Sequence, residues 1–220
     1  MKNRVALVFG ATGLIGSEVV RLLLASEAYG EVHAVVRKEL GVEDDKLHVH
    51  LTDFSDLSSL ELPENATDVF CCLGTTQKKA GSKEAFYAID FQLAFGLAQL
   101  AREAGAEQFL MVSSIGAAAG SSNYYLKVKG ELEEAVRGLS YPCTRVFRPS
   151  LLLGERQEQR FAEGLAGSVL PYLSFLFKGP LRKYRPIEGA AVARSLVAAA
   201  LEGGRGFNVL EGDEIAKRAG

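Results

Sequence analysis

The sequence predicts an α/β protein with a doubly wound parallel sheet, and two observations support this prediction. Short runs rich in valine, leucine and phenylalanine alternate with longer stretches of helical periodicity. The short runs are continuously apolar, which is typical of parallel strands covered by helices on both faces. No linker or repeat divides the chain, so we expect a single three-layer domain over residues 1–220.

The expected elements can be placed along the chain from these runs. The expected strands cover residues 4–10, 31–37, 47–53, 66–74, 106–114, 141–150 and 205–212. The expected helices cover residues 14–26, 57–60, 84–105, 124–139 and 188–204. Gly105 ends the longest of these helices, because glycine is common just past a helix terminus. Strands that alternate with helices in this way build βαβ units, which place the strands parallel.

Charge and apolar patterning exclude several classes of protein. The formal net charge is −2, so the chain has no basic field to attract nucleic acid. No stretch approaches the ~20 apolar residues that cross a bilayer, and we expect no stable membrane insertion. The apolar run near the N-terminus is broken by Gly10 and Gly13, which argues against an export signal.

The cysteines and histidines do not have the spacing of a metal site. The three cysteines are Cys71, Cys72 and Cys143, and the histidines lie away from them. His48 and His50 alternate on an expected strand, where we expect ordinary imidazoles and no metal ion. Reduced thiols fit best, so we expect a cytoplasmic protein.

A glycine-rich turn follows the first expected strand. The stretch VFGATGLIGSE places Gly10, Gly13 and Gly16 between that strand and the first helix. In a Rossmann fold the first glycine permits a tight turn, the second admits a pyrophosphate and the third lets the helix pack on the strand. The free N–H groups at the helix start then face the phosphates. The turn predicts NAD(P) binding, and Thr12, Leu14 and Ile15 complete its predicted contacts.

The end of the second expected strand bears on the choice of cofactor. An NAD site offers an acidic residue to the ribose hydroxyls at this point. This chain has Arg37 followed by Lys38, and a guanidinium binds a 2′-phosphate as a fork. NADP(H) is therefore favoured over NAD(H). The alternative is that Arg37 is only a solvated strand end and Glu39 takes the ribose.

A tyrosine and a lysine on the fourth expected helix form a candidate proton-transfer unit. Tyr125 and Lys129 are four residues apart and so share a helix face, whereas Tyr124 lies elsewhere around the helix. The strand before this helix ends in Ser113 and Ser114, at the sheet edge where α/β proteins bind ligands. An ammonium lowers the pKa of a phenol, ordinarily about 10, by favouring phenolate. A serine hydroxyl can hold a substrate oxygen. The alternative is a solvated helix face.

Four longer stretches extend this pattern. They are VFCCLGTTQKKAGS at 69–82, VSSIGA at 112–117, YLKVKGELE at 125–133 and VFRPSLLLGERQEQR at 146–160. With them the chain resembles, over nearly its whole length, the atypical short-chain dehydrogenases/reductases. More narrowly, it resembles the Tat-interacting-protein-like oxidoreductases, a subgroup that binds NADPH.

The resemblance implies roles for particular residues. It implies a catalytic set of Ser114, Tyr125 and Lys129, with Ser113 as the close alternative to Ser114 and with Lys129 also binding the nicotinamide ribose. It implies that further cofactor contacts follow the third, fourth and sixth strands: Asp53 and Phe54 by the adenine, Leu73, Gly74 and Thr75 along the middle, and Arg148, Pro149 and Ser150 near the nicotinamide. Too few residues follow the sixth strand for the full second domain of sugar-modifying relatives, which argues against epimerase activity.

Two functions follow from these expectations. The first is an NADP(H)-dependent oxidoreductase acting on a small carbonyl or alcohol substrate. The second is a catalytically silent NADPH-binding protein that acts through a protein partner. Residues 155–186 are expected to cap the nicotinamide end. Three interpretations of this segment remain: packing or a homodimer contact, a lid over a small-molecule substrate, or contact with a membrane surface.

Overall fold

The computed structural model describes residues 4–153 and 185–220, and these build one large parallel sheet. Its strand order is β3-β2-β1-β4-β5-β6-β9, and every neighbouring pair is parallel. The strands are β1 (Arg4–Phe9), β2 (Tyr29–Val36), β3 (Leu47–Leu51), β4 (Asp68–Cys71), β5 (Gln108–Val112), β6 (Cys143–Arg148) and β9 (Gly206–Glu211). Because the strands are parallel, their carboxyl ends all lie at the same end of the sheet, and the loops that follow them meet there.

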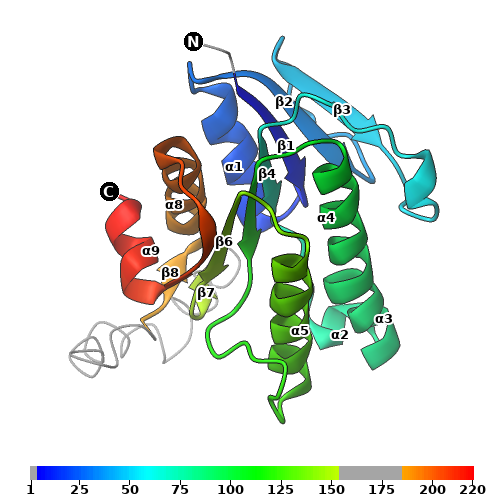
Figure 1. Ribbon diagram of the computed structural model, residues 1–220, viewed down its shortest axis with the longest axis vertical. Helices are drawn as coiled ribbons and strands as arrows, with labels where there is room; N and C mark the ends of the chain where they lie inside the picture. Colours follow the sequence, from blue (N-terminus) through cyan, green and yellow to red (C-terminus); the bar gives the residue numbers. More distant parts are fainter. Residues whose placement is uncertain (1–3, 154–184) are drawn as a thin grey trace.

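Helices cover both faces of the sheet (Figure 1). They are α1 (Leu14–Leu24), α2 (Gln77–Ala80), α3 (Lys83–Tyr87), a π-helix η2 (Ala88–Leu93), α4 (Ala94–Glu103), α5 (Tyr124–Gly138), α8 (Gly189–Glu202) and α9 (Gly212–Arg218). A 3-10 turn η1 (Leu57–Ser59) and a small parallel pair, β7 (Leu152–Leu153) with β8 (Ile187–Glu188), complete the described elements.

The core has two layers, one on each face of the sheet. On one face the buried residues of α1 and α8, such as Val19 and Leu196, pack on the sheet. On the other face α4 and α5 contribute residues such as Leu97 and Val136. Because strand side chains alternate, β2 supplies both layers: Val32 belongs to the first and Val35 to the second. The doubly wound α/β class predicted from the sequence is confirmed.

The structure differs from the expected elements mainly in the long helix. The chain is helical from Lys83 to Glu103, but η2 interrupts it with one π-helical segment. Such segments are rare and are frequent at functional sites. The expected capping segment lies outside the described residues, except for Arg185 and Pro186. Within the two described ranges, no helix combines the length and the apolar character needed to cross a bilayer.

Candidate cofactor and active site

The glycine turn between β1 and α1 is tightly closed. Gly10 has φ +82°, and a Cβ there would lie 2.7 Å from the carbonyl oxygen of Cys72, which directly follows the neighbouring β4. A Cβ on Gly16 would lie 2.1 Å from the Gly10 carbonyl oxygen. Gly13 stands at the N-cap of α1 and has no side chain to occupy the helix start. The turn therefore needs glycine at Gly10 and Gly16, and it leaves the helix N-terminus accessible to a phosphate.

Three further turn residues take different positions. Ile15 is buried in the core, while Thr12 and Leu14 are exposed. Leu14 keeps 47% of its surface exposed, although it also contacts the start of α8. A Cβ on Gly189 would lie 2.7 Å from Leu14 Cγ, so the first turn of α8 packs closely against this side chain. Leu14 thus has one side against α8 and another free to contact a ligand.

Lys129 is buried on α5 and forms an ion pair with Asp90. Its Nζ lies 2.7 Å from Asp90 Oδ1, and the side chains keep only 4% and 0% of their surface exposed. Asp90 lies on the π-helical segment, and its Oδ2 accepts a hydrogen bond of 2.9 Å from the Thr75 backbone N–H. Burial alone would lower the pKa of Lys129, but the charges of Asp90 and Tyr125 outweigh it and the pKa lies above its ordinary value. Lys129 is therefore an ammonium at neutral pH.

The two tyrosines at the start of α5 have different surroundings. The Tyr124 hydroxyl donates to the Lys83 carbonyl oxygen at 3.2 Å, and its ring lies beside the Lys83 ammonium. Tyr124 thus holds α5 against α3. Tyr125 packs its ring beside Phe86, with 5.7 Å between centroids, and is near enough to Lys129 to affect its pKa. Of the two, Tyr125 is the one on the Lys129 side of the helix.

The two serines after β5 are also distinguished. Ser113 is buried, and its hydroxyl donates to Glu133 Oε1 in a short hydrogen bond. Ser114 is partly exposed, and its hydroxyl makes only a long contact of 3.5 Å to the Ile115 carbonyl oxygen. Ser113 therefore has a partner within the fold, whereas the Ser114 hydroxyl can bind a ligand oxygen.

The middle of the expected cofactor path follows β4. Leu73 packs against the core, and Gly74 lies over the buried ion pair. A Cβ on Gly74 would lie 3.3 Å from Lys129 Nζ, so a side chain at this position would crowd the ammonium. Thr75 is tied to Asp90 through its backbone N–H. These contacts join the end of β4 to Lys129.

The residues expected near the adenine lie after β2 and β3. Arg37 directly follows β2 and is exposed. Asp53 is exposed, and Ser55 lowers its pKa through its side chain and through its backbone N–H, which donates a 2.8 Å hydrogen bond to Asp53 Oδ1. Phe54 has φ +62°, an uncommon backbone conformation for a non-glycine residue, and its side chain packs on the α4-side core. The backbone here forms a fixed turn beside the strand ends.

The three residues after β6 are held by contacts within the protein. The Arg148 guanidinium pairs with Glu133, at 2.5 Å, and with Glu211, at 3.5 Å. The Pro149 carbonyl accepts a hydrogen bond from the Ile115 N–H, and the Ser150 hydroxyl donates to the Arg185 carbonyl. Arg148 thus directs its charge toward the two carboxylates, while Pro149 fixes the loop that carries Ser114.

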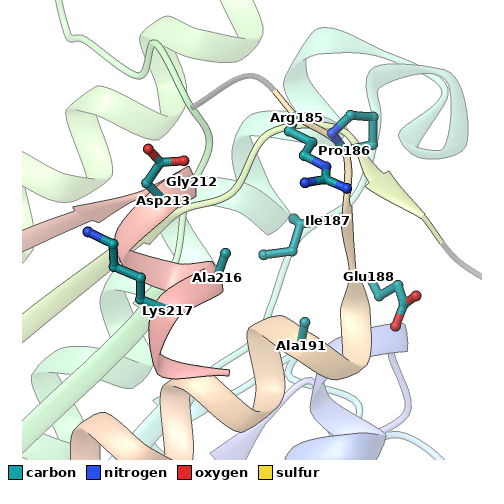
Figure 2. A pocket seen from close by; sticks show the side chains of 9 residues that line it. All are labelled: Arg185, Pro186, Ile187, Glu188, Ala191, Gly212, Asp213, Ala216 and Lys217. Carbon is teal, nitrogen blue, oxygen red and sulfur yellow. The ribbon is translucent and has the colours of Figure 1, made fainter. Parts of the chain in front are cut away.

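A separate hollow of about 390 Å³ lies near the carboxyl end of β9 (Figure 2). Its lining comes from β8 and the two residues before it, from the start of α8 and from α9. It consists of Arg185, Pro186, Ile187, Glu188, Ala191, Gly212, Asp213, Ala216 and Lys217. None of the site residues expected from the sequence lines it. The last two residues of the expected capping segment, Arg185 and Pro186, do.

The sheet order and the glycine turn together define the class of protein. The order β3-β2-β1-β4-β5-β6 with a glycine-rich turn after β1 is that of a Rossmann dinucleotide-binding domain. A family model described as NAD(P)H-binding matches residues 10–163. The chain belongs to this NAD(P)H-binding family.

Relatives and solved structures agree with this assignment. The chain is 38% identical over 204 residues to Protein FMP52-1, mitochondrial, from Scheffersomyces stipitis, covering 90% of this chain and 88% of the relative. It is 36% identical over 170 residues to Protein HTATIP2 from Rattus norvegicus, covering 76% and 70%. MoeE5 in complex with UDP-glucose and NAD has the same fold, with a TM-score of 0.67, 19% identity and coverage of 97% and 80%. The resemblance to the Tat-interacting-protein-like subgroup is confirmed.

One expectation from the sequence is wrong by these comparisons. We expected a cytoplasmic protein, but relatives from several fungi are named mitochondrial proteins. The expectation rested on cysteines without disulfide partners, and in the structure all three are free thiols. Free thiols indicate a reducing environment, which does not by itself identify a compartment.

Proposed function

We propose that the protein is an NADP(H)-dependent oxidoreductase that interconverts a small carbonyl compound and its alcohol. One observation carries this proposal: Lys129 is kept charged by Asp90 in a buried site, on the same helix face as Tyr125. Burying an ammonium is costly and is offset only by a close partner. A solvated helix face does not need this arrangement, whereas a phenol that transfers protons does.

Three residues of the chain have separate roles in the reduction of the carbonyl. When bound, NADPH would supply the hydride that reduces the carbonyl carbon and would leave as NADP+. The Ser114 hydroxyl donates a hydrogen bond to the carbonyl oxygen and orients it. Tyr125 gives its proton to the same oxygen, and the Lys129 ammonium stabilises the phenolate that remains. The product alcohol carries the hydride on carbon and the proton on oxygen, and Tyr125 regains a proton from water.

Turnover of carbonyl compounds tests this proposal. Purified protein is mixed with NADPH and a panel of aliphatic and aromatic aldehydes and ketones, and NADPH oxidation is followed by absorbance. We expect oxidation that saturates with at least one class of carbonyl. Saturable NADPH binding without oxidation of any member would instead support the silent binding protein that acts through a partner.

Arg37 is proposed to bind the 2′-phosphate and so to select NADP(H). It stands exposed at the carboxyl end of β2, where this phosphate lies in Rossmann domains. We expect Arg37→Ala to weaken NADPH binding about 10- to 100-fold, because a charge-assisted hydrogen bond contributes about 1.5–3 kcal/mol. NADH binding should change little, because NADH lacks the phosphate.

Titration of each nucleotide, followed by the fluorescence of the reduced nicotinamide, measures this difference. The matched control is Arg205→Ala, which removes an exposed arginine just before β9, at the opposite edge of the sheet. Equal losses of NADPH and NADH affinity in Arg37→Ala would contradict the assignment, as would an Arg205→Ala protein with the same defect.

A further inference from the structure

Three histidines and a glutamate gather on one face of β2 and β3, away from the proposed active site. His33 pairs in register with His48, and Val35 with His50, so all three imidazoles lie on the same face. That face is opposite to the one where Val32 and Ala34 pack against the α1 and α8 layer. Glu31 lies two residues before His33 and joins them. We call these four residues the histidine cluster.

The rings and the carboxylate are already close together. The His33 ring stacks on those of His48 and His50, with centroids 4.7 Å and 5.2 Å apart. Single ligand atoms of Glu31, His33 and His48 all lie within 4.8 Å of one another. In a tetrahedral zinc site, bonds of about 2.0–2.1 Å separate neighbouring ligand atoms by about 3.3 Å. His48 is exposed, so its ring can turn toward the other two ligands when an ion binds.

The hydrogen bonds of His33 suit a metal ligand. Its Nε2 lies 3.0 Å from Glu31 Oε2, and its Nδ1 lies 2.9 Å from His50 Nε2. Without an ion, His33 Nε2 donates to the Glu31 carboxylate, which can only accept, and Nδ1 accepts from His50 Nε2. With an ion bound, the proton would be on Nδ1 and would be donated to His50, which would leave the Nε2 lone pair for the ion. Histidine ligands usually donate their second N–H in this way, which fixes the ring and its tautomer.

From this geometry we propose that Glu31, His33 and His48 bind a zinc ion, with His50 orienting His33. Two imidazoles and one carboxylate are ligands that zinc accepts, while calcium and magnesium prefer sites made only of oxygen. His33 is buried, but His48 is exposed, so the ion has a path from solvent and room for a water as fourth ligand. Because β3 is the edge strand, the ion would join it to β2. This proposal differs from the expectation from the sequence, which was ordinary imidazoles and no metal ion.

Zinc titration tests the proposal. Zinc sulfate is titrated by calorimetry into full-length protein from which any affinity tag has been removed. We expect one equivalent to bind the wild type and His48→Gln to weaken binding by at least about tenfold. His48 is exposed, so this variant should fold, and an unchanged affinity for NADPH verifies that. The matched control is Asp45→Asn, an exposed carboxylate just before β3, which should bind zinc as the wild type does.

A second readout reports the ligand geometry. Cobalt(II) bound in place of zinc should give the intense visible absorption of a four-coordinate site, and His33→Gln should abolish it. The proposal is overturned if the wild type shows no saturable binding at micromolar zinc. It is also overturned if His48→Gln binds as tightly as the wild type, since the ion would then be held elsewhere, for example by cysteine.

Discussion

Replacing Tyr125 with phenylalanine is expected to lower carbonyl turnover about 10²- to 10⁴-fold, the range for loss of a positioned general acid. The aromatic ring is retained, so its packing beside Phe86 should persist. Affinity for NADPH should be nearly unchanged, because the hydroxyl acts on the substrate oxygen. Steady-state rates with the best carbonyl of the panel, together with NADPH titration of both proteins, measure the two effects separately.

The preceding residue supplies the control for this experiment. Tyr124→Phe also removes one phenolic hydroxyl, but that hydroxyl bonds to the Lys83 carbonyl oxygen between helices. We expect Tyr124→Phe to lose at most about 1 kcal/mol of stability and to keep its turnover. If Tyr125→Phe retained wild-type turnover, the general-acid role would be wrong. If both variants lost activity equally, the cause would be the start of α5 rather than one proton.

The central strands β1, β4 and β5 could be predicted from the sequence because each is largely a continuous apolar run covered on both faces. β4 is an example: Val69 and Phe70 are adjacent, and each is fully buried in a different layer of the core. The helix of residues 84–105 was also predicted, but not its π-helical segment. The stretch AIDFQL contains no glycine or proline to mark it, and the segment places Asp90 against Lys129 on another helix.

The candidate site could be predicted only in part, for a similar reason. Helical spacing alone was enough to pair Tyr125 with Lys129. Spacing could not distinguish Ser113 from Ser114. They differ because Glu133, on a helix further along the chain, accepts the hydrogen bond of the Ser113 hydroxyl. Asp90 and Glu133 were both missed, since buried carboxylates are identified by partners that lie far along the chain. An isolated acid within the apolar run of residues 84–105 was the one available signal.

Asp90 should have the largest effect on stability among the residues around Lys129. Asp90→Asn keeps an oxygen for the Thr75 N–H but removes the negative charge beside the buried ammonium. Removing one partner of a buried ion pair typically costs about 3–5 kcal/mol, because the remaining charge is left without compensation. We expect the free energy of unfolding in urea at neutral pH to fall by about that amount. Turnover should fall as well, since burial would then lower the pKa of Lys129 and weaken its hold on the phenolate.

A surface pair on the same helix provides the control. Lys127 and Glu131 lie 3.8 Å apart with both side chains partly exposed, so Glu131→Gln should cost at most about 0.5 kcal/mol. The double variant Asp90→Asn with Lys129→Met should recover part of the lost stability but none of the turnover, because the buried charge is gone and so is the group that acts on Tyr125. Equal stability losses for Asp90→Asn and Glu131→Gln would show that Asp90 does not offset the cost of burying the Lys129 ammonium.

Between neutrality and about pH 10, the contribution of Lys129 to stability should be nearly independent of pH in the wild type but should increase with pH in Asp90→Asn. In the wild type the pKa of Lys129 is raised above 10.5, so its contribution is complete below that pH and declines as pH rises through the folded-state value. In Asp90→Asn we expect the folded-state pKa to lie below that of the unfolded chain. The unfolded state then binds more protons, and stability should increase with pH up to about 10.4. Urea unfolding at several pH values between neutrality and about 10 compares the two slopes, and parallel slopes would mean that Asp90 does not control the charge of Lys129.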